Sequence, residues 1–147
     1  MGLVYAEIEL INGADWVLSQ EGLREEKNIR RMDIRAMVDS GAYMLAINET
    51  IKAQLGLRVL EHRTAELADG RVLRLEVVGP VEVRFQNRQT TCRAMVLPGK
   101  SEVLLGAIPM EDMDVLIDPR KQRLIVNPEH PNISQMAMKG FRHGHLD

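Results

Sequence analysis

An aspartate that could do acid–base chemistry stands in the stretch AMVDSGAYML, from Ala36 to Leu45. Asp39 follows an apolar run and precedes three small residues, Ser40, Gly41 and Ala42. Backbone amides of such a turn can hold a carboxylate at the end of a buried strand, because Gly41 lets the chain bend tightly beside it. Two interpretations follow: a catalytic aspartate, or a polar turn that caps a strand.

The other reactive residue types show no comparable arrangement. Cys92 stands in the middle of a predicted strand, with no neighbouring histidine or helix N-terminus to activate its thiol. Ser40 lacks the Gly-x-Ser-x-Gly context of a serine nucleophile. Of the four histidines only His143 and His145 stand close together, and no cysteine or glutamate completes a tetrahedral set around them. We therefore expect no metal site and no cofactor, and Asp39 remains the candidate.

The composition is that of a soluble globular protein and excludes several classes of partner. The 147 residues carry a formal charge of −2 and only 3% aromatic side chains, which argues against nucleic-acid binding. No apolar run is long enough to span a membrane, and Glu7 and Glu9 interrupt the N-terminal apolar stretch, which therefore does not resemble a signal peptide. A single cysteine precludes an intrachain disulfide and indicates a reducing compartment, so we expect a cytoplasmic protein.

Strands dominate the first half of the chain. Alternating apolar and polar residues predict a strand from Leu3 to Ile11, and RMDIRAMV predicts another that ends at Val38. The charged stretch Val17–Arg31 between them is expected to be an exposed loop or a frayed turn of helix, inserted in a hairpin. Asn48 and Gly56 have the residue types of an N-cap and a C-terminal glycine, and they bracket a predicted short helix in NETIKAQLG.

The second half of the chain predicts three hairpins. LRVLEHRTAELA and RVLRLEVV flank Asp69-Gly70, a dipeptide typical of two-residue hairpin turns, and Gly79-Pro80 is expected to interrupt the strands that follow. VEVRF pairs with TTCRAMVL, and DVLID with RLIVN. Ahead of the last hairpin, EVLLGAIPMEDM predicts a buried strand that Gly106 breaks, followed by a short helix.

Together these elements predict one all-β domain over residues 1–127, a small closed barrel with one or two short helices. The sequence contains no internal repeat and no low-complexity tract. Residues 128–147 show no clear period, and we expect a C-terminal tail that is poorly ordered or docks on a partner.

The order of three motifs resembles a known family. The Asp-Ser-Gly-Ala turn is followed by a hairpin with a flexible tip, AELADGRVL, and then by an apolar-apolar-glycine strand, EVLLG, that leads into a short helix. From Leu3 to Asn127 the chain is similar in this arrangement to the retropepsin-like aspartic proteases, the retroviral-type enzymes and their bacterial relatives. The charged Val17–Arg31 insertion and the C-terminal tail match the bacterial members better.

The resemblance implies roles for particular residues. The catalytic carboxylate would be that of Asp39. The residues supporting its turn would be Ser40, Gly41 and Ala42. A flap closing over the substrate would contain Ala68, Asp69 and Gly70. The element packing beneath the turn would contain Leu104, Leu105 and Gly106. Apolar pockets for the substrate are expected among Leu67, Val72, Leu73 and Ile108.

The chemistry of that family requires a second carboxylate. Two neighbouring carboxylates share one proton, because like charges about 3 Å apart cannot both ionise. The chain has one Asp-Ser-Gly, so the second Asp39 must come from another copy, and we predict a homodimeric endopeptidase acting on peptides or proteins. Ala107 follows Gly106 where retroviral members often carry an arginine that stabilises the dimer, which leaves the mode of pairing open.

Two other functions stay open at this stage. The same fold could serve as a catalytically silent dimeric module that binds or scaffolds a partner. Alternatively, the chain is a small all-β domain in which Asp39 only caps a turn. Retention of an intact Asp-Ser-Gly favours the enzyme, because a silent copy has no chemical need for the acid.

Overall fold

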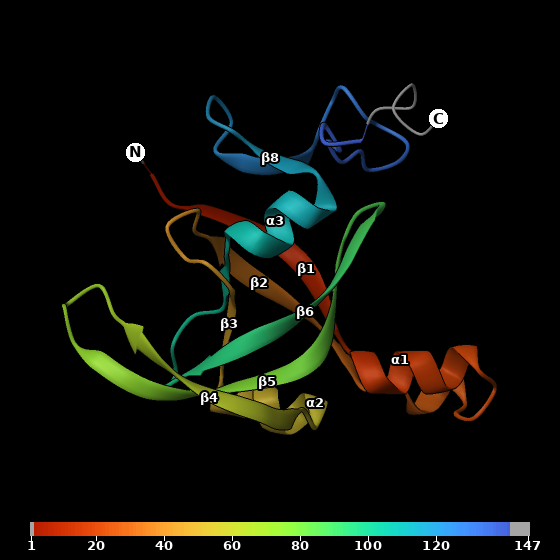
Figure 1. Cartoon of the computed structure of the whole chain (residues 1–147), viewed down its shortest axis with the longest axis vertical. Helices are drawn as coiled ribbons and strands as arrows, with labels where there is room; N and C mark the ends of the chain where they lie inside the picture. Colours follow the sequence, from red (N-terminus) through yellow and green to blue (C-terminus); the bar gives the residue numbers. More distant parts are fainter. Residues whose placement is uncertain (1, 142–147) are drawn as a thin grey trace.

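The computed structural model describes residues 2–141 and consists mainly of strands. Six strands form a closed ring in the order β1-β2-β7-β3-β6-β5 and back to β1 (Figure 1). Their bounds are β1 Val4–Asn12, β2 Arg31–Val38, β3 Leu45–Asn48, β5 Val72–Phe85, β6 Arg88–Leu97 and β7 Leu104–Leu105. The strands outside the ring are β4 (Arg58–Glu66) beside β5, and the hairpin of β8 (Val115–Asp118) and β9 (Arg123–Val126) beside β1. The predicted small closed all-β barrel is confirmed.

Alternate residues of the ring strands fill the barrel. Ala6, Ile8 and Leu10 of β1 are buried together with Leu45 and Ile47 of β3, and each belongs to one continuous core. Burying a leucine or isoleucine side chain stabilises the fold by about 1.5–3 kcal/mol relative to leaving it exposed. Because side chains alternate along a strand, the intervening residues lie on the outer face of the barrel, where a binding site can form.

Two helices lie where the sequence predicts them. α2 (Glu49–Leu55) begins at Asn48, whose Oδ1 accepts a hydrogen bond from the Ile51 N–H at 3.0 Å. Gly56 ends that helix with φ of 62°, a left-handed conformation that suits glycine. α3 (Ala107–Met113) begins directly after Gly106. The prediction of α2 rests on local capping chemistry, which the sequence displays directly, whereas α3 has no capping side chain at Gly106.

A third helix corrects the expectation for the charged stretch. α1 (Gly13–Gln20) starts before Val17 and projects from the barrel, and a short 3₁₀ turn, Glu26–Asn28, follows it (Figure 1). The stretch is largely exposed, as expected, but it begins as a regular helix, so the described chain has three α-helices rather than one or two.

The anchor of α1 is a buried carboxylate that sequence patterning does not reveal. Asp15 is 1% exposed, and its two oxygens accept bonds from Arg30 Nε and Nη2 at 2.9 and 3.0 Å. Arg24 lies 3.2 Å from the same carboxylate. The side-chain hydrogen bond from Arg30 is the main reason that the pKa of Asp15 is lowered. A charge run is thus held to the domain by one ion cluster.

The hairpin between β4 and β5 differs from expectation at both ends. Its tip is a three-residue turn rather than a two-residue one, since the Leu67 N–H donates to the Arg71 carbonyl at 2.8 Å and Gly70 has φ of 85°. At the other end β5 continues through Gly79-Pro80 as one strand, with a register shift between Val78 and Val81. A bulge of this kind bends a strand without ending it.

The chain beyond β9 contains no helix or strand among its described residues, yet its first part is fixed to the domain. Asp114 accepts hydrogen bonds from Asn127 Nδ2 and the Gln135 N–H, both at 3.0 Å, and its Oδ2 lies 2.7 Å from His130 Nδ1. Arg88 donates to the His130 carbonyl. The division at residue 127 stays a prediction, and His143 and His145 lie outside the described residues.

Asp114 is expected to control how firmly residues 127–135 are held. The hydrogen bond from Asn127, then those from Gln135 and His130, lower the pKa of Asp114 to about 2. A lowered pKa means that its stabilising contribution is complete above the unfolded value near 3.9 and is lost as pH falls through about 2. At neutral pH, Asp114→Asn should speed amide hydrogen exchange at Gln135 about tenfold or more. The control is Glu129→Gln, and unchanged exchange in Asp114→Asn would contradict this role.

Candidate active site

Asp39 stands at the point where β2 leaves the barrel. The neighbouring β7 segment fixes its backbone, because the Met37 N–H donates to the Val103 carbonyl at 2.8 Å and the Asp39 N–H to the Leu105 carbonyl at 3.0 Å. The Gly41 N–H then donates to Asp39 Oδ1 at 2.9 Å. The carboxylate is therefore oriented by the main chain of its own turn, and its other oxygen has no hydrogen-bond partner among residues 2–141.

Gly106 lies directly beneath this turn and leaves no room for a side chain. A Cβ at that position would meet the Met44 carbonyl oxygen at 2.3 Å and the Ala42 carbonyl oxygen at 2.8 Å. Just beyond it, the Ala107 N–H donates to the Ala42 carbonyl at 2.8 Å. The start of α3 is thereby bonded to the loop that follows Asp39.

The structure brings together the two motifs that the sequence separates by the whole hairpin. Leu104 and Leu105 pair in parallel with Met37 and Val38 of β2. Leu104 also pairs with Ala46 of β3, so β7 joins the two strands on either side of the Asp39 turn. Leu104, Leu105 and Gly106 therefore lie against the Asp39 turn, and their role as its support stays a prediction.

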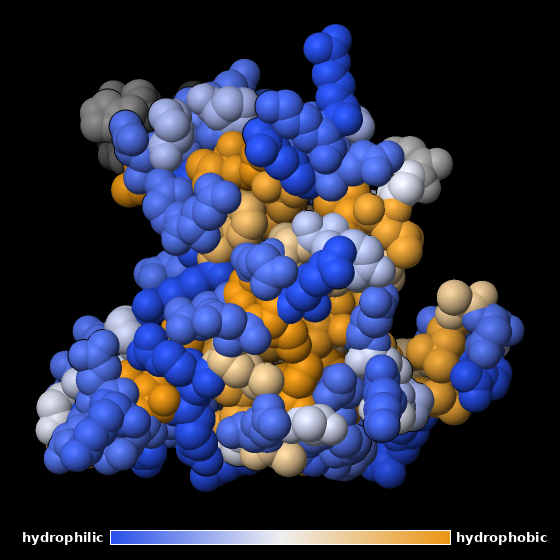
Figure 2. Space-filling view, turned by 180° about the vertical axis from the view of Figure 1, so that it is seen from behind, coloured by the Kyte–Doolittle hydropathy of each residue, from blue (hydrophilic) through white to orange (hydrophobic). Residues whose placement is uncertain are grey.

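A cavity of about 790 Å³ opens beside Asp39, on the outer face of the barrel. Its floor comes from Ala46, Met95, Leu97 and Leu104, and Gly41 to Met44 line the end next to Asp39. The hairpin contributes residues 63–68 of β4 and the turn. Figure 2 shows the projecting hairpin at the right, separated by a notch from the body and apolar on the side facing the notch. The site is a cleft with an apolar floor, a carboxylate at one end and a hairpin above it.

The flap residues predicted from the sequence have different positions in this cleft. Ala68 and Leu67 line the cavity, whereas Asp69 and Gly70 form the hairpin tip outside its lining. The Asp69 carboxylate accepts bonds from the Arg71 N–H at 3.0 Å and from Arg71 Nε at 2.7 Å, and these bonds, led by the backbone one, lower its pKa. The tip is thus stiffened by its own turn chemistry.

The predicted apolar pocket is only partly right. Of the four residues expected there, Leu67 alone lines the cavity; Val72, Leu73 and Ile108 do not in this single chain. Met95 and Leu97 take their place, and Arg63 adds a charge. No local motif marks these three residues. Their alternation within strands is visible in the sequence, but the pairing of the strands that places them on one face is not.

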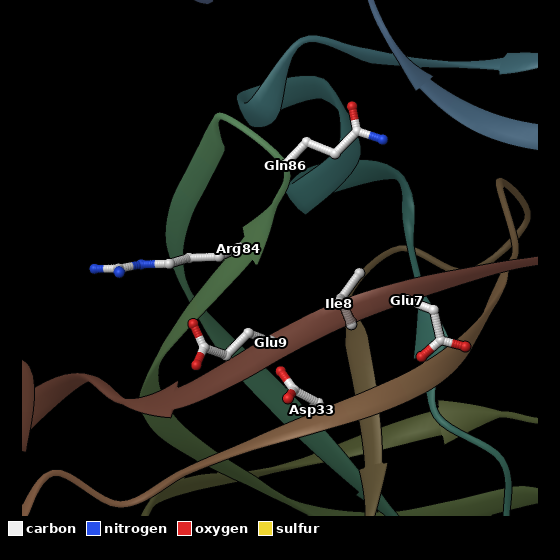
Figure 3. A pocket seen from close by; sticks show the side chains of 6 residues that line it. All are labelled: Glu7, Ile8, Glu9, Asp33, Arg84 and Gln86. Atoms are coloured by element: carbon white, nitrogen blue, oxygen red, sulfur yellow. The ribbon is translucent and has the colours of Figure 1, made fainter.

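Other groups offer no second catalytic centre within the described residues. Burial, more than the nearby Glu82 and Asp112, raises the pKa of the Cys92 thiol to about 12, so it is not a nucleophile at neutral pH. A second cavity, of about 600 Å³, is lined by Glu9, Asp33 and Arg84 among others, and Arg84 points away from the two carboxylates (Figure 3). No group of three or more His, Cys, Asp or Glu in residues 2–141 is placed to hold a metal ion.

A closed all-β barrel, an Asp-Ser-Gly turn packed against the glycine that follows β7, and a hairpin above the cleft define a retropepsin-like protein. Residues 27–111 match the model of the family described as "gag-polyprotein putative aspartyl protease". The chain belongs to this family of retroviral-type aspartyl proteases.

The solution structure of simian foamy virus (mac) protease is similar, with 17% identity, a TM-score of 0.46, and coverage of 72% of this chain and 90% of that chain. No curated protein matches the sequence significantly. None of the described helices is long and apolar enough to cross a membrane.

Proposed function

We propose that the protein is a homodimeric aspartic endopeptidase that hydrolyses peptide bonds through a water activated by two Asp39 carboxylates. The observation that carries the proposal is the position of Asp39. Its Oδ1 is held by the Gly41 N–H at 2.9 Å, and the side chain lines a cleft large enough for an extended peptide. Family membership supports protease chemistry, and the single cysteine favours a cytoplasmic enzyme.

The mechanism uses the pair of carboxylates as one acid–base unit. One proton is shared between them, so the pair carries a single negative charge. The ionised carboxylate takes a proton from the water while the water oxygen attacks the peptide carbonyl carbon. The protonated carboxylate donates its proton to the carbonyl oxygen. The tetrahedral intermediate then breaks at the C–N bond as the leaving nitrogen receives a proton, giving a carboxylic acid and an amine.

A second chain must complete this unit. The only other carboxylate lining the cavity is that of Glu66, which is exposed on the hairpin and is not fixed by a hydrogen bond among the described residues. By contrast, Asp39 is fixed by backbone on both sides of its turn. A two-fold axis beside Asp39 would place two equally rigid carboxylates face to face.

Exposed apolar side chains beside Asp39 support such an axis. Tyr43 is 68% exposed and Ile108 is 42% exposed, although the two segments are joined by a 3.0 Å bond from the Ile108 N–H to the Tyr43 carbonyl. Both side chains therefore remain exposed to solvent in the single chain. Apolar groups of this kind are the usual centre of an interface between copies.

Tyr43→Asp is therefore expected to weaken self-association. A charge in the middle of the proposed interface should raise the dimer dissociation constant about 100-fold, because it must be desolvated without a partner. Sedimentation velocity over a concentration series measures this constant. Val17→Asp, on the exposed side of α1, is the control and should leave association unchanged. Equal dimerisation of Tyr43→Asp and the native protein would place the interface elsewhere.

Cleavage of a peptide library, read by mass spectrometry from acid to neutral pH, tests the proposed activity. We expect cuts between apolar residues and a bell-shaped pH profile that reports the two apparent pKa values of the carboxylate pair. The alternative, a catalytically silent module, predicts peptide binding without cleavage at any pH.

A further inference from the structure

One outer face of the sheet connects the candidate active site with the hairpin above it. A row of residues, each paired with the next on the neighbouring strand, runs across six strands. In order from β4 to β2 these residues are Glu61, Val77, Met95, Ala46, Leu104 and Met37. Partners in register point to the same side of a sheet. Since Asp39 follows Met37 by two residues and lines the cavity with Ala46 and Met95, this face runs from β4 to the catalytic turn.

The chemistry of this face changes along its length. Near Asp39 the floor is uncharged, with Ala46, Met95 and Leu104. At the β4 end, Glu61 binds two guanidinium groups: Arg63 donates to its Oε1 through Nε, and Nη1 of Arg93 lies 3.5 Å from its Oε2. Arg63 itself lines the cavity. The cleft is thus apolar next to Asp39, where the scissile bond would lie, and charged at the rim formed by β4.

The rim cluster of Arg63, Glu61 and Arg93 carries an excess positive charge. Two guanidinium groups face one carboxylate, and all three side chains are 39–43% exposed. The Arg63 terminal nitrogens have no hydrogen-bond partner among residues 2–141. The cavity also contains Glu66, but it occupies the alternate, outward position of β4, whereas Arg63 shares the inward row with Ala65 and Leu67. A guanidinium group with free donors matches a carboxylate in shape and charge.

We infer that the cleft selects peptides that carry an acidic side chain at a fixed distance from the cut, bound by Arg63 with the support of Arg93. β4 lies five strand spacings from β2, about 24 Å along the curled sheet, and Arg63 and Asp39 lie about 13 Å apart along the strand direction, so the path between them is at most about 27 Å. An extended peptide advances about 3.3 Å per residue, which places the acidic residue within about eight positions of the scissile bond. This inference rests on the proposed peptidase function.

Binding to the Asp39→Asn protein tests the inference without turnover. The probes are fluorescent peptides with an apolar centre and an otherwise uncharged sequence, in which one Glu is moved position by position and compared with Gln at the same place. At one register the Glu peptide should bind about tenfold or more tightly than its Gln counterpart, the range of a charge-assisted hydrogen bond. At the other registers the two peptides should bind equally.

Variants at the rim identify the group responsible. Adding Arg63→Ala should remove the preference for Glu over Gln at that register. Glu61→Gln should strengthen the preference, because it frees both guanidinium groups. Arg74→Ala is the matched control, since Arg74 pairs with Thr64 on the opposite face of the hairpin and does not line the cavity.

The outcomes separate this inference from the proposed function. Binding of Glu and Gln peptides with equal affinity at every register would overturn the inference alone, as would a Glu preference that survives Arg63→Ala. If no peptide bound the Asp39→Asn protein and none were cleaved by the native protein, the proposed function and the inference would both fall.

Discussion

Replacing Asp39 with asparagine should abolish peptide hydrolysis, with a loss of about 10⁴-fold or more in kcat. Asparagine keeps the size of the side chain, and its Oδ1 can still accept the Gly41 N–H that aspartate accepts at 2.9 Å. In the proposed mechanism, the change removes the ability to take a proton from water and to share one with the Asp39 of a second chain. Fold and dimer should therefore persist while chemistry stops.

Mixing the two proteins makes the test sharper. If native and Asp39→Asn chains exchange freely at equal concentration, about a quarter of the dimers keep two aspartates, and activity should fall to that fraction of the all-native value. An enzyme that used Asp39 within one chain would retain about half. Unfolding curves that coincide for the two proteins would serve as the control for structure.

Two results would contradict the assignment of Asp39. One is an Asp39→Asn protein that cleaves peptides at the native rate. The other is activity that follows the native fraction linearly in the mixing experiment, which would turn attention to Glu66, the second carboxylate lining the cavity.

Gly106→Ala should destabilise the protein by about 3 kcal/mol or more. The backbone at Gly106 has φ of −87°, which any residue adopts, so the cause is space and not conformation. The added Cβ would lie 2.3 Å from the Met44 carbonyl oxygen and 2.8 Å from that of Ala42, and both are backbone atoms that cannot rotate away. Relief requires the Asp39 turn to separate from α3, which breaks the bond between Ala107 and Ala42.

Urea unfolding measures this loss, and Gly140→Ala is the matched control. A Cβ at Gly140 would meet no atom within 4 Å, so stability should stay within about 0.5 kcal/mol of the native value. If Gly106→Ala unfolded at the native urea concentration, the contact between α3 and the Asp39 turn would be looser than the structure describes. Gly106→Ala protein that still folds should lose activity, because the displaced turn carries the Asp39 carboxylate.

Local chemistry explains which parts of the structure are predictable. α2 is confirmed because Asn48 and Gly56 carry its start and end signals within one short segment. The end of β2 before Asp39 is visible for the same reason, since an apolar run gives way to a small-residue turn. The hairpin of β4 and β5 is also confirmed, although the Gly70 turn has three residues and not two.

Long-range contacts explain what could not be predicted. α1 is held by Asp15, which is buried because Arg30 pairs with it from beyond the helix. The pattern of charged residues in this part of the sequence does not indicate that Asp15 and Arg30 form a pair. The lining of the cleft by Arg63, Met95 and Leu97 likewise depends on the register of β4 and β6 within the sheet.

The sequence by itself determined the chemical identity of the candidate site: one carboxylate, the small residues of its turn, and the glycine strand that must approach it. Tertiary structure alone decided that a side chain at Gly106 would lie within 3 Å of carbonyl oxygens in the Asp39 loop, and that the cleft has an apolar floor and a charged rim. The physical reason is that the sequence specifies each side chain directly. Strand order and register, by contrast, result from burying one face of every strand in a shared core.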